Sequence, residues 1–227
     1  MERRNALAAL LSAIAGAVDV IGFQRLGLFT AHITGNVVVV AAELVSGGPP
    51  RRLQILAIPV FVVAVAATWA IAKGLGHRGT ELLRPLLVVQ CLLIAGVLLM
   101  SLMDRNDANR DASVKSLAAM LAVSAMACQF ATLRIALPGV TSTSVMTGNL
   151  TQIVVSAFDM ASSKQSIDGA QGQLAAAGRS FVGFVFGCAT GALAVIWLQR
   201  WAWFLPLAIA ALATLTPVEP TEQVPES

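Results

Sequence analysis

Two short polar stretches with the same pattern interrupt the otherwise apolar sequence of this chain. Residues 30–36 are Thr-Ala-His-Ile-Thr-Gly-Asn, and residues 143–149 are Thr-Ser-Val-Met-Thr-Gly-Asn. Four of the seven positions are identical, and they hold only Thr, Gly and Asn. Apolar composition alone does not produce such a polar pattern twice, so we interpret the pair as the marker of an internal duplication.

The residue types that recur in both stretches have distinct chemical uses. A threonine can cap the start of a helix, a glycine lets a backbone or ligand approach closely, and an asparagine offers both donor and acceptor groups. Two helix starts of this kind inside a membrane protein could present free N–H groups to an anionic substrate. The alternative role is tight packing between helices. The residues in question are Thr34, Gly35, Asn36, Thr147, Gly148 and Asn149.

Four further residues could carry chemistry within or beside the apolar runs. Asp19 lies late in the first run, where a carboxylate is costly unless it is paired, hydrated or protonated, or else sits in the interface as a cap. Arg134, preceded by Gln129, occupies nearly the matching place in the second half, so Asp19 and Arg134 could pair; alternatively Arg134 extends to the interface. His32 matches Val145, and a lone histidine beside a helix start is typically a hydrogen-bonded structural residue.

These ten positions form the predicted substrate-binding set, and no catalytic, metal or cofactor site is expected beside them. The three cysteines lie singly in apolar runs without Cys-x-x-Cys or Cys/His spacing. The sequence has no phosphate loop, no Gly-x-Ser-x-Gly, no His-Glu-x-x-His and no dinucleotide-binding fingerprint. We therefore do not expect an enzyme.

Composition places the chain in a membrane. It is 57% hydrophobic and 12% charged, with a mean hydropathy of +0.78, which is too apolar for an ordinary soluble domain. Charge-free windows such as 53–72, 85–103 and 180–199 approach the ~20 residues that a helix needs to cross a bilayer. The basic residues lie mainly at the ends of the apolar runs, so they indicate topology and not a nucleic-acid surface. We predict an all-α polytopic helical membrane protein.

Eight apolar segments can be marked, four in each half of the chain. Residues 5–103 form the predicted first membrane repeat, 104–115 a connecting polar loop, 116–216 the second repeat, and 217–227 a disordered acidic tail. The second segment of each half, at 12–15 residues or about 18–22 Å, is either extended into a full span or a re-entrant half-helix. Four crossings per half give parallel repeats and three give inverted ones. The basic residues favour eight segments and a cytoplasmic N-terminus.

The signature residues resemble those of a known family. Residues 16–23 (GAVDVIGF) and 29–36 (FTAHITGN) resemble the first signature of the YoaK-type family of bacterial inner-membrane proteins. Residues 129–134 (QFATLR) and 141–151 (TSTSVMTGNLT) are similar to its second signature, and the resemblance runs from about residue 5 to 216. The chain departs from the family pattern at Ile33 and Phe130, where members carry Met and Asn. The resemblance implies a membrane fold and supplies no substrate, because the family has no assigned function.

Three functions follow as hypotheses. The first is a transporter or channel of the bacterial inner membrane for a small polar or anionic solute, with a central site between the repeats. The second is a non-transporting scaffold or sensor, in which the same residues only hold the two halves together. An intramembrane enzyme is the third, and the absence of a nucleophile–base pair disfavours it. The expected partners are the lipid bilayer and a solute, without nucleic acid; homo-oligomerisation stays open.

Overall fold

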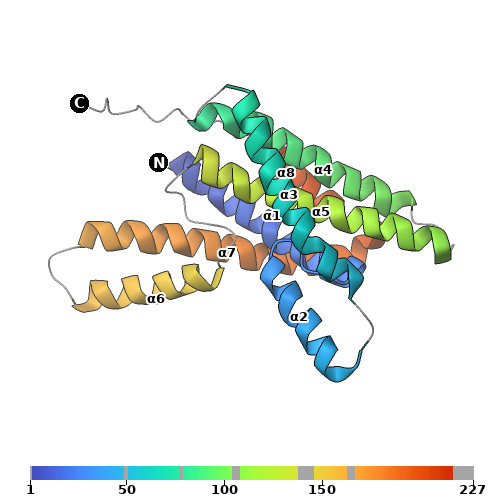
Figure 1. Cartoon of the computed structure of the whole chain (residues 1–227). Helices are drawn as coiled ribbons and strands as arrows, with labels where there is room; N and C mark the ends of the chain where they lie inside the picture. Colours follow the sequence, from blue (N-terminus) through green and yellow to red (C-terminus); the bar gives the residue numbers. More distant parts are fainter. Residues whose placement is uncertain are drawn as a thin grey trace.

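The computed structural model describes residues 2–48, 51–76, 79–103, 108–137, 146–162 and 167–216, which form helices and contain no strand (Figure 1). The expected all-α fold is confirmed. The helices are α1 (Glu2–Leu26), α2 (Ile33–Ser46), α3 (Arg52–Gly74), α4 (Leu83–Met103), α5 (Ala108–Ala136), α6 (Met146–Ser162), α7 (Ile167–Leu198) and α8 (Phe204–Leu215), with the short 3-10 helices η1 (Gly79–Leu82) and η2 (Gln199–Trp201).

Five helical stretches are long and apolar enough to cross a membrane. They have 21 to 31 residues, against the ~20 that a bilayer requires, and are Ala6–Leu26, Arg52–Gly74, Gly79–Met103, Ala112–Ala136 and Gln171–Trp201. Large apolar side chains stand on their outer faces: Val62, Leu92 and Phe186 each expose more than 60% of their surface. Such faces suit lipid contact, so the chain is a multi-pass membrane protein.

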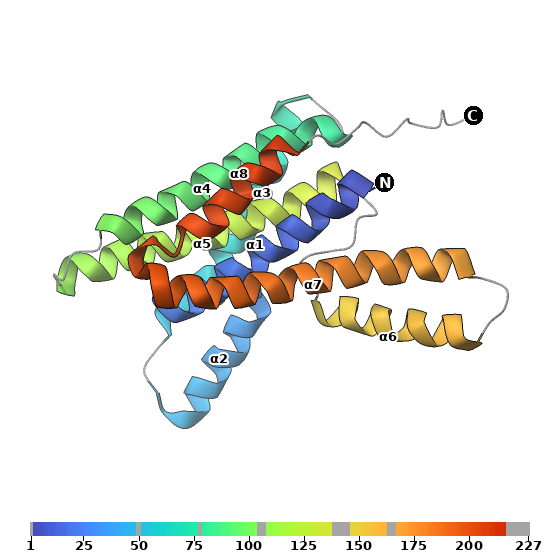
Figure 2. The ribbon, with the colours of Figure 1, turned by 180° about the vertical axis from the view of Figure 1, so that it is seen from behind.

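Helices α1 and α5 form the centre of the bundle. They are the most buried of the five spans, and the other long helices pack around them. Helix α1 contacts α5, α7 and α8, whereas α5 contacts α3 and α4 (Figures 1 and 2). The apolar residues of α1 are buried around its whole circumference, among them Leu7, Leu11 and Ile14. The residues carried by α1 are therefore held in the interior.

Small residues bring α1 and α7 into unusually close contact. Three glycines spaced four residues apart on α7 each face an alanine of α1, in the pairs Gly183–Ala9, Gly187–Ala13 and Gly191–Ala17. A Cβ at Gly183 would lie 2.5 Å from the backbone carbonyl oxygen of Ala9. Both residue numbers rise together along the contact, so α1 and α7 run in the same direction. Small residues at four-residue spacing are a common interface between membrane helices, because they let the backbones approach.

The five long helices of the bundle and the shorter α8, of 12 residues, alternate in direction. Helices α1, α4 and α7 run one way along the bundle, and α3, α5 and α8 run the other way (Figures 1 and 2). Helices α2 and α6 each begin near the middle of the bundle and lead outwards, with α2 packed on α3 and α6 on α7. The 14 residues of α2 rise only about 21 Å, short of the ~30 Å hydrocarbon core. The arrangement favours the half-helix interpretation over eight full crossings.

Local boundaries correct two expectations and leave a third untested. The predicted connecting loop 104–115 is helical from Ala108 onwards. Thr34 and Thr147 are not N-caps: His32 holds that position before α2, and α6 already includes Met146, so both threonines lie in the first helical turn. The predicted tail 217–227 and residues 143–145 of the second polar stretch lie outside the described residues.

The close approach of α1 and α7 leads to a stability prediction. A Cβ added at Gly187 would lie 2.7 Å from the Cα of Ala13, so the backbones would have to move apart. We expect Gly187→Ala to lower the free energy of unfolding by roughly 1–3 kcal/mol, the usual cost of overpacking. Thermal unfolding of the purified protein in detergent measures it.

The matched control lies on the same helix. Nothing stands within 4 Å of a Cβ built at Gly178, so Gly178→Ala is expected to be neutral or slightly stabilising, because alanine is the better helix former. Equal stability of the two variants would show that the α1–α7 contact does not constrain the fold.

Candidate functional site

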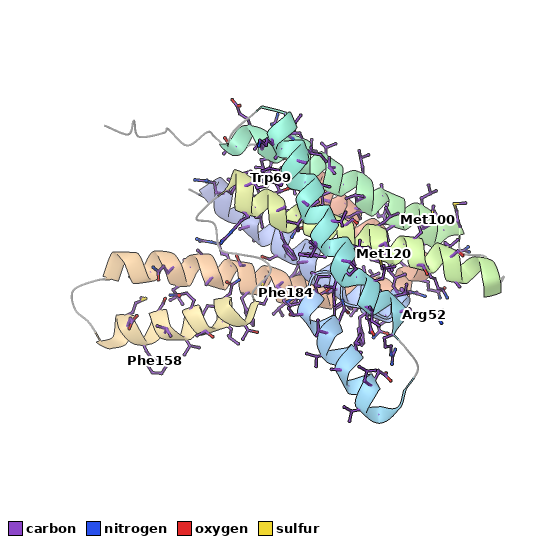
Figure 3. The ribbon with its side chains drawn as sticks, viewed as in Figure 1. Arg52, Trp69, Met100, Met120, Phe158 and Phe184 are labelled. Carbon is purple, nitrogen blue, oxygen red and sulfur yellow. The ribbon has the colours of Figure 1, made fainter. Side chains whose placement is uncertain are left out.

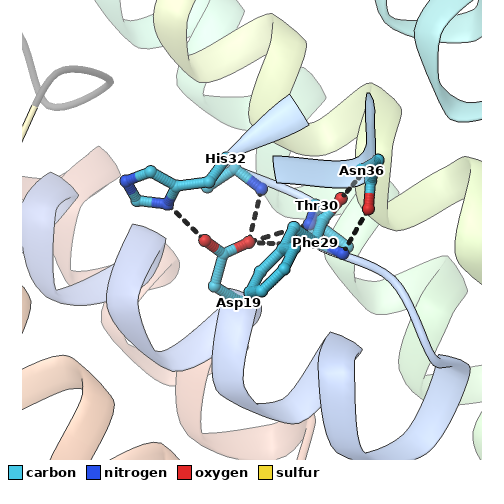
Figure 4. A network of polar contacts seen from close by, with 6 residues as sticks. Asp19, Phe29, Thr30, His32 and Asn36 are labelled. Atoms are coloured by element: carbon cyan, nitrogen blue, oxygen red, sulfur yellow. Dashed lines mark hydrogen bonds and ion pairs between the residues drawn. The ribbon is translucent and has the colours of Figure 1, made fainter. Parts of the chain in front are cut away.

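The buried carboxylate of Asp19 is the centre of a compact polar cluster. Asp19 is 5% exposed on α1. Its Oδ1 accepts hydrogen bonds from the backbone N–H groups of Thr30 at 2.8 Å and Ala31 at 2.6 Å, and from the Thr30 hydroxyl at 3.2 Å (Figure 4). Its Oδ2 pairs with Nδ1 of His32. Both carboxylate oxygens are thus satisfied within the protein, as a buried charge requires.

The loop that supplies these donors is shaped by the residues around it. Gly27 adopts a φ of 77°, a left-handed conformation that suits glycine, and its N–H bonds to the carbonyl oxygens of Gly22 and Phe23. This bond pattern ends α1 and turns the chain back towards Asp19. The aromatic rings of Phe23 and Phe29 then stack with centroids 4.8 Å apart. The turn is therefore closed by both backbone bonds and side-chain packing.

Asn36 holds the same loop from the side of α2. Its Oδ1 accepts a hydrogen bond from the N–H of Phe29 at 2.9 Å, and its Nδ2 donates to the carbonyl of Phe29 at 2.7 Å. Asn36 is fully buried. A Cβ at Gly35 would lie 3.0 Å from the ring of Phe29, which explains the small residue there. In the first polar stretch, glycine and asparagine thus position the loop that satisfies Asp19, while Thr34 is exposed.

His32 joins three helices at this cluster. It precedes α2, pairs with Asp19 of α1, and packs edge-on against the ring of Phe184 on α7, with centroids 5.3 Å apart. The hydrogen bond to Asp19 raises the pKa of His32 above its usual value, and the negative charge of Asp19 adds to this; partial burial acts in the opposite direction. The half-buried imidazole is therefore stabilised in its charged form. Its prediction as a hydrogen-bonded residue is correct, and its partner is Asp19.

Gln129 lies in the bundle interior, in a different cluster. Its Nε2 donates to the carbonyl oxygen of Leu11 on α1 at 2.9 Å, and its Oε1 accepts from Nε2 of Gln90 on α4 at 2.7 Å. Leu11 is eight residues before Asp19, or about 12 Å along the helix. Gln129 therefore connects α5 to α1 and α4. It is not a neighbour of Asp19.

Arg134 does not pair with Asp19. Its side chain is exposed near the end of α5, and the ion pairs among the described residues are His32–Asp19 and Arg51–Glu43. The hypothesis of an Asp19–Arg134 pair at the centre is wrong. The reason is local: the loop after α1 folds back far enough to fill every position around the carboxylate.

The second polar stretch lies at the start of α6. Asn149 is buried and its Nδ2 lies 3.7 Å from the sulfur of Met146, whereas Thr147 and Gly148 are exposed. Asn36 and Asn149 are thus both buried near the starts of short helices. The segment before Met146, which corresponds to the loop that Asn36 holds through Phe29, lies outside the described residues.

Several residues of the cluster were not predicted as site residues. They are Phe29, Thr30, Phe184 and, in the second cluster, Gln90. The glycines at 183, 187 and 191 could have indicated that α7 packs closely on another helix, which is what brings Phe184 to His32. Within the part of the chain that the structure describes, no group of three or more His, Cys, Asp or Glu side chains is placed to hold a metal ion.

Comparison with known families gives one match. The model of a family described as "Protein of unknown function (DUF1275)" matches residues 7–216, which include every candidate position above. No curated protein and no solved structure matches the chain. The expected membership in a family without an assigned function is confirmed.

Removal of the Asn36 side chain tests its structural role. Asn36→Ala leaves the backbone N–H and carbonyl of Phe29 without their partners, and an unsatisfied buried polar group costs about 1–3 kcal/mol. We expect a loss of stability of that size, measured by thermal unfolding in detergent. Thr34→Ala, an exposed change in the same stretch, should have almost no effect. A loss as large in Thr34→Ala as in Asn36→Ala would contradict the proposed clamp.

The raised pKa of His32 predicts a pH dependence of stability. The folded-state pKa of His32 lies above its unfolded value of about 6.5. The Asp19–His32 pair therefore contributes its full stabilisation to the folded protein at pH values below about 6.5. The contribution is lost as the pH rises through the folded-state pKa. We expect the unfolding temperature to fall from pH 6 to 9 by more in wild type than in His32→Gln. Thr34→Ala, an exposed change beside the same loop, provides the control and should keep the wild-type dependence.

Proposed function

The chain belongs to the DUF1275 family of proteins of unknown function, and we propose that it is a transporter or channel for a small polar or anionic solute. The observation that carries this proposal is the Asp19–His32 pair, in which Asp19 belongs to the candidate span Ala6–Leu26 and His32 precedes the short helix α2. Ionisable residues inside a membrane bundle usually mark a solute or proton pathway. The proposal assigns no enzymatic activity to the chain.

The packing of the helices supports two repeats of inverted topology. If α1–α4 are exchanged with α5–α8, α1 corresponds to α5, α3 to α7 and α4 to α8. The contacts of α1 with α7 and α8 then correspond to the contacts of α5 with α3 and α4. The α2–α3 contact likewise corresponds to the α6–α7 contact. The corresponding helices run in opposite directions (Figures 1 and 2). Each repeat would then pair one half-helix, α2 or α6, with three helices that alternate in direction, of which α8 has only 12 residues. Many secondary transporters are built from inverted repeats.

The two half-helices supply the features that a solute site needs. In transporters with broken helices, the N-terminus of a half-helix lies near the substrate, because its N–H groups and dipole favour negative charge. The start of α2 carries the half-buried His32 and the exposed Thr34, and the start of α6 carries the exposed Thr147 and Gly148. A protonated His32 would add positive charge for an anionic or polar solute.

The proposal places the chain in a bacterial inner membrane with a cytoplasmic N-terminus. The support for this orientation is the pair Arg3–Arg4 before the first apolar run, since basic residues near the first span favour the cytoplasmic side. The alternation of the five long helices would put the end of α7 on the side opposite the start of α1, and the shorter α8 runs back towards that start (Figures 1 and 2).

A scaffold or sensor is the second candidate, and one observation favours it. Asp19 and Asn36 use their hydrogen bonds on the loop between α1 and α2, so both residues hold the fold together without any ligand. In a scaffold, the same cluster would only lock α1, α2 and α7. The two candidates differ in whether a solute binds at His32.

A ligand screen with matched variants separates the candidates. The unfolding temperature of the purified protein is measured in detergent against a panel of small polar and anionic metabolites. A binder at 100 times its Kd stabilises by about 2.7 kcal/mol. We expect a hit that is lost in His32→Gln, which leaves the backbone bonds of Asp19 in place, and kept in Glu43→Gln, which removes only an exposed ion pair.

Flux then tests transport itself. Proteoliposomes that contain the wild type should take up the stabilising solute, and those that contain His32→Gln should not. A screen without any hit, combined with an unfolded Asp19→Asn variant, would favour the scaffold. A hit that binds without crossing the membrane would favour the sensor.

A further inference from the structure

A basic pocket lies at the end of the bundle where α1 and α4 end and α5 begins. Its volume is about 230 Å³. Three of the residues that line it are cations from separate elements: Arg25 at the end of α1, Lys115 in the first turns of α5, and Arg200 in η2. Met100 of α4, which also lines it, marks this end of the bundle in Figure 3. The pocket is separate from Asp19, which lies six residues or about 9 Å before Arg25 along α1.

Specific bonds build the walls of this pocket. The Ser101 hydroxyl donates to the carbonyl of Arg200 at 2.9 Å, which ties the end of α4 to the turn after α7. Arg25 donates through Nη2 to the carbonyl of Val195 at 3.2 Å, which ties α1 to α7. Trp203, 1% exposed, closes another side. The pocket is thus formed by tertiary contacts between four elements.

The turn beside the pocket has an unusual backbone. Gln199 has a φ of 48°, the one positive φ among the described residues other than glycine. A left-handed conformation is disfavoured for a residue with a side chain, and such residues often occur at functional sites. Here the conformation ends α7 and directs Arg200 towards the end of the bundle. The strained turn therefore places one of the three cations.

The three cations have no acidic partner in the described part of the chain. No acidic residue lines the pocket, and the ion pairs described, His32–Asp19 and Arg51–Glu43, lie elsewhere. Like charges gathered in one pocket repel one another unless an anion neutralises them. Arginine and lysine side chains from several directions, together with the polar Gln24, provide donors that a phosphate group can accept.

The position along the membrane helices indicates the depth of the pocket. Three spans end here, Ala6–Leu26, Gly79–Met103 and Gln171–Trp201, and Ala112–Ala136 begins here. The ends of spans lie at the membrane–water interface, where tryptophans such as the half-exposed Trp201 are favoured. The phosphates of lipid headgroups lie at this level in either leaflet, so the basic side chains of the pocket can reach them.

We propose that the pocket of Arg25, Lys115 and Arg200 binds a phosphate group. The group belongs either to an anionic lipid headgroup or to free phosphate, since both present the same oxygens to the same cations. Binding neutralises the three charges and connects the ends of α1, α4 and α5 with the turn after α7. This site goes beyond the proposed solute pathway and does not depend on it.

The test compares probes and charge variants of the full chain. Delipidated protein in neutral detergent receives phosphatidylglycerol, phosphatidylcholine or inorganic phosphate, and its unfolding temperature is titrated to obtain an apparent Kd. Lys115→Gln is the first variant, because its exposed side chain forms no hydrogen bond with the described residues; Arg200→Gln is the second. We expect each to weaken binding roughly fivefold, the effect of one basic charge near a lipid surface.

The control and the remaining outcomes complete the test. Arg52→Gln removes an exposed cation at the start of α3, outside the pocket, and should keep wild-type binding (Figure 3). Stabilisation by phosphatidylglycerol alone identifies a lipid headgroup, and stabilisation by inorganic phosphate without lipid identifies free phosphate. The proposal is overturned if neither probe stabilises the wild type more than phosphatidylcholine, or if Lys115→Gln and Arg200→Gln bind as well as Arg52→Gln.

Discussion

A carboxylate inside an apolar helix bundle has to find hydrogen-bond donors, and much of this structure depends on how Asp19 finds them. The donors come from the loop that directly follows α1, so the chain must turn back on itself as soon as the helix ends. As a consequence, the short helix α2 begins directly beside Asp19.

The same constraint links three helices. Asn36 can clamp Phe29 only because α2 starts beside the loop, and His32 can reach Phe184 only because α7 lies very close to α1. That closeness depends on the glycines of α7, where any side chain would meet the backbone of α1. The polar cluster and the glycine contact are therefore parts of one arrangement. A movement of α7 along α1 would therefore change the surroundings of His32.

The two polar regions of the protein have different characters. Around Asp19 the charge is satisfied by its own loop, and its partner His32 remains half-buried at the start of α2. At the end of the bundle, three cations meet without an acidic partner among the described residues. The first region suits reversible contact with a solute inside the membrane, because it is complete without one. The second suits a resident anion at the interface, because its charges repel one another when it is empty.

Hydropathy and segment length were sufficient to predict an all-α membrane protein and its eight helices, because a helix that crosses lipid must be apolar over a defined length. Asp19, His32 and Asn36 were also recognisable, since polar residues are rare in such runs. Their partners were not: Asp19 pairs with His32 and not with Arg134, and Gln129 bonds to Gln90 of α4. Which side chains meet depends on how the chain turns after α1 and on how closely α7 approaches it. These features are decided by packing between segments far apart in the sequence, and so only the tertiary structure determines them.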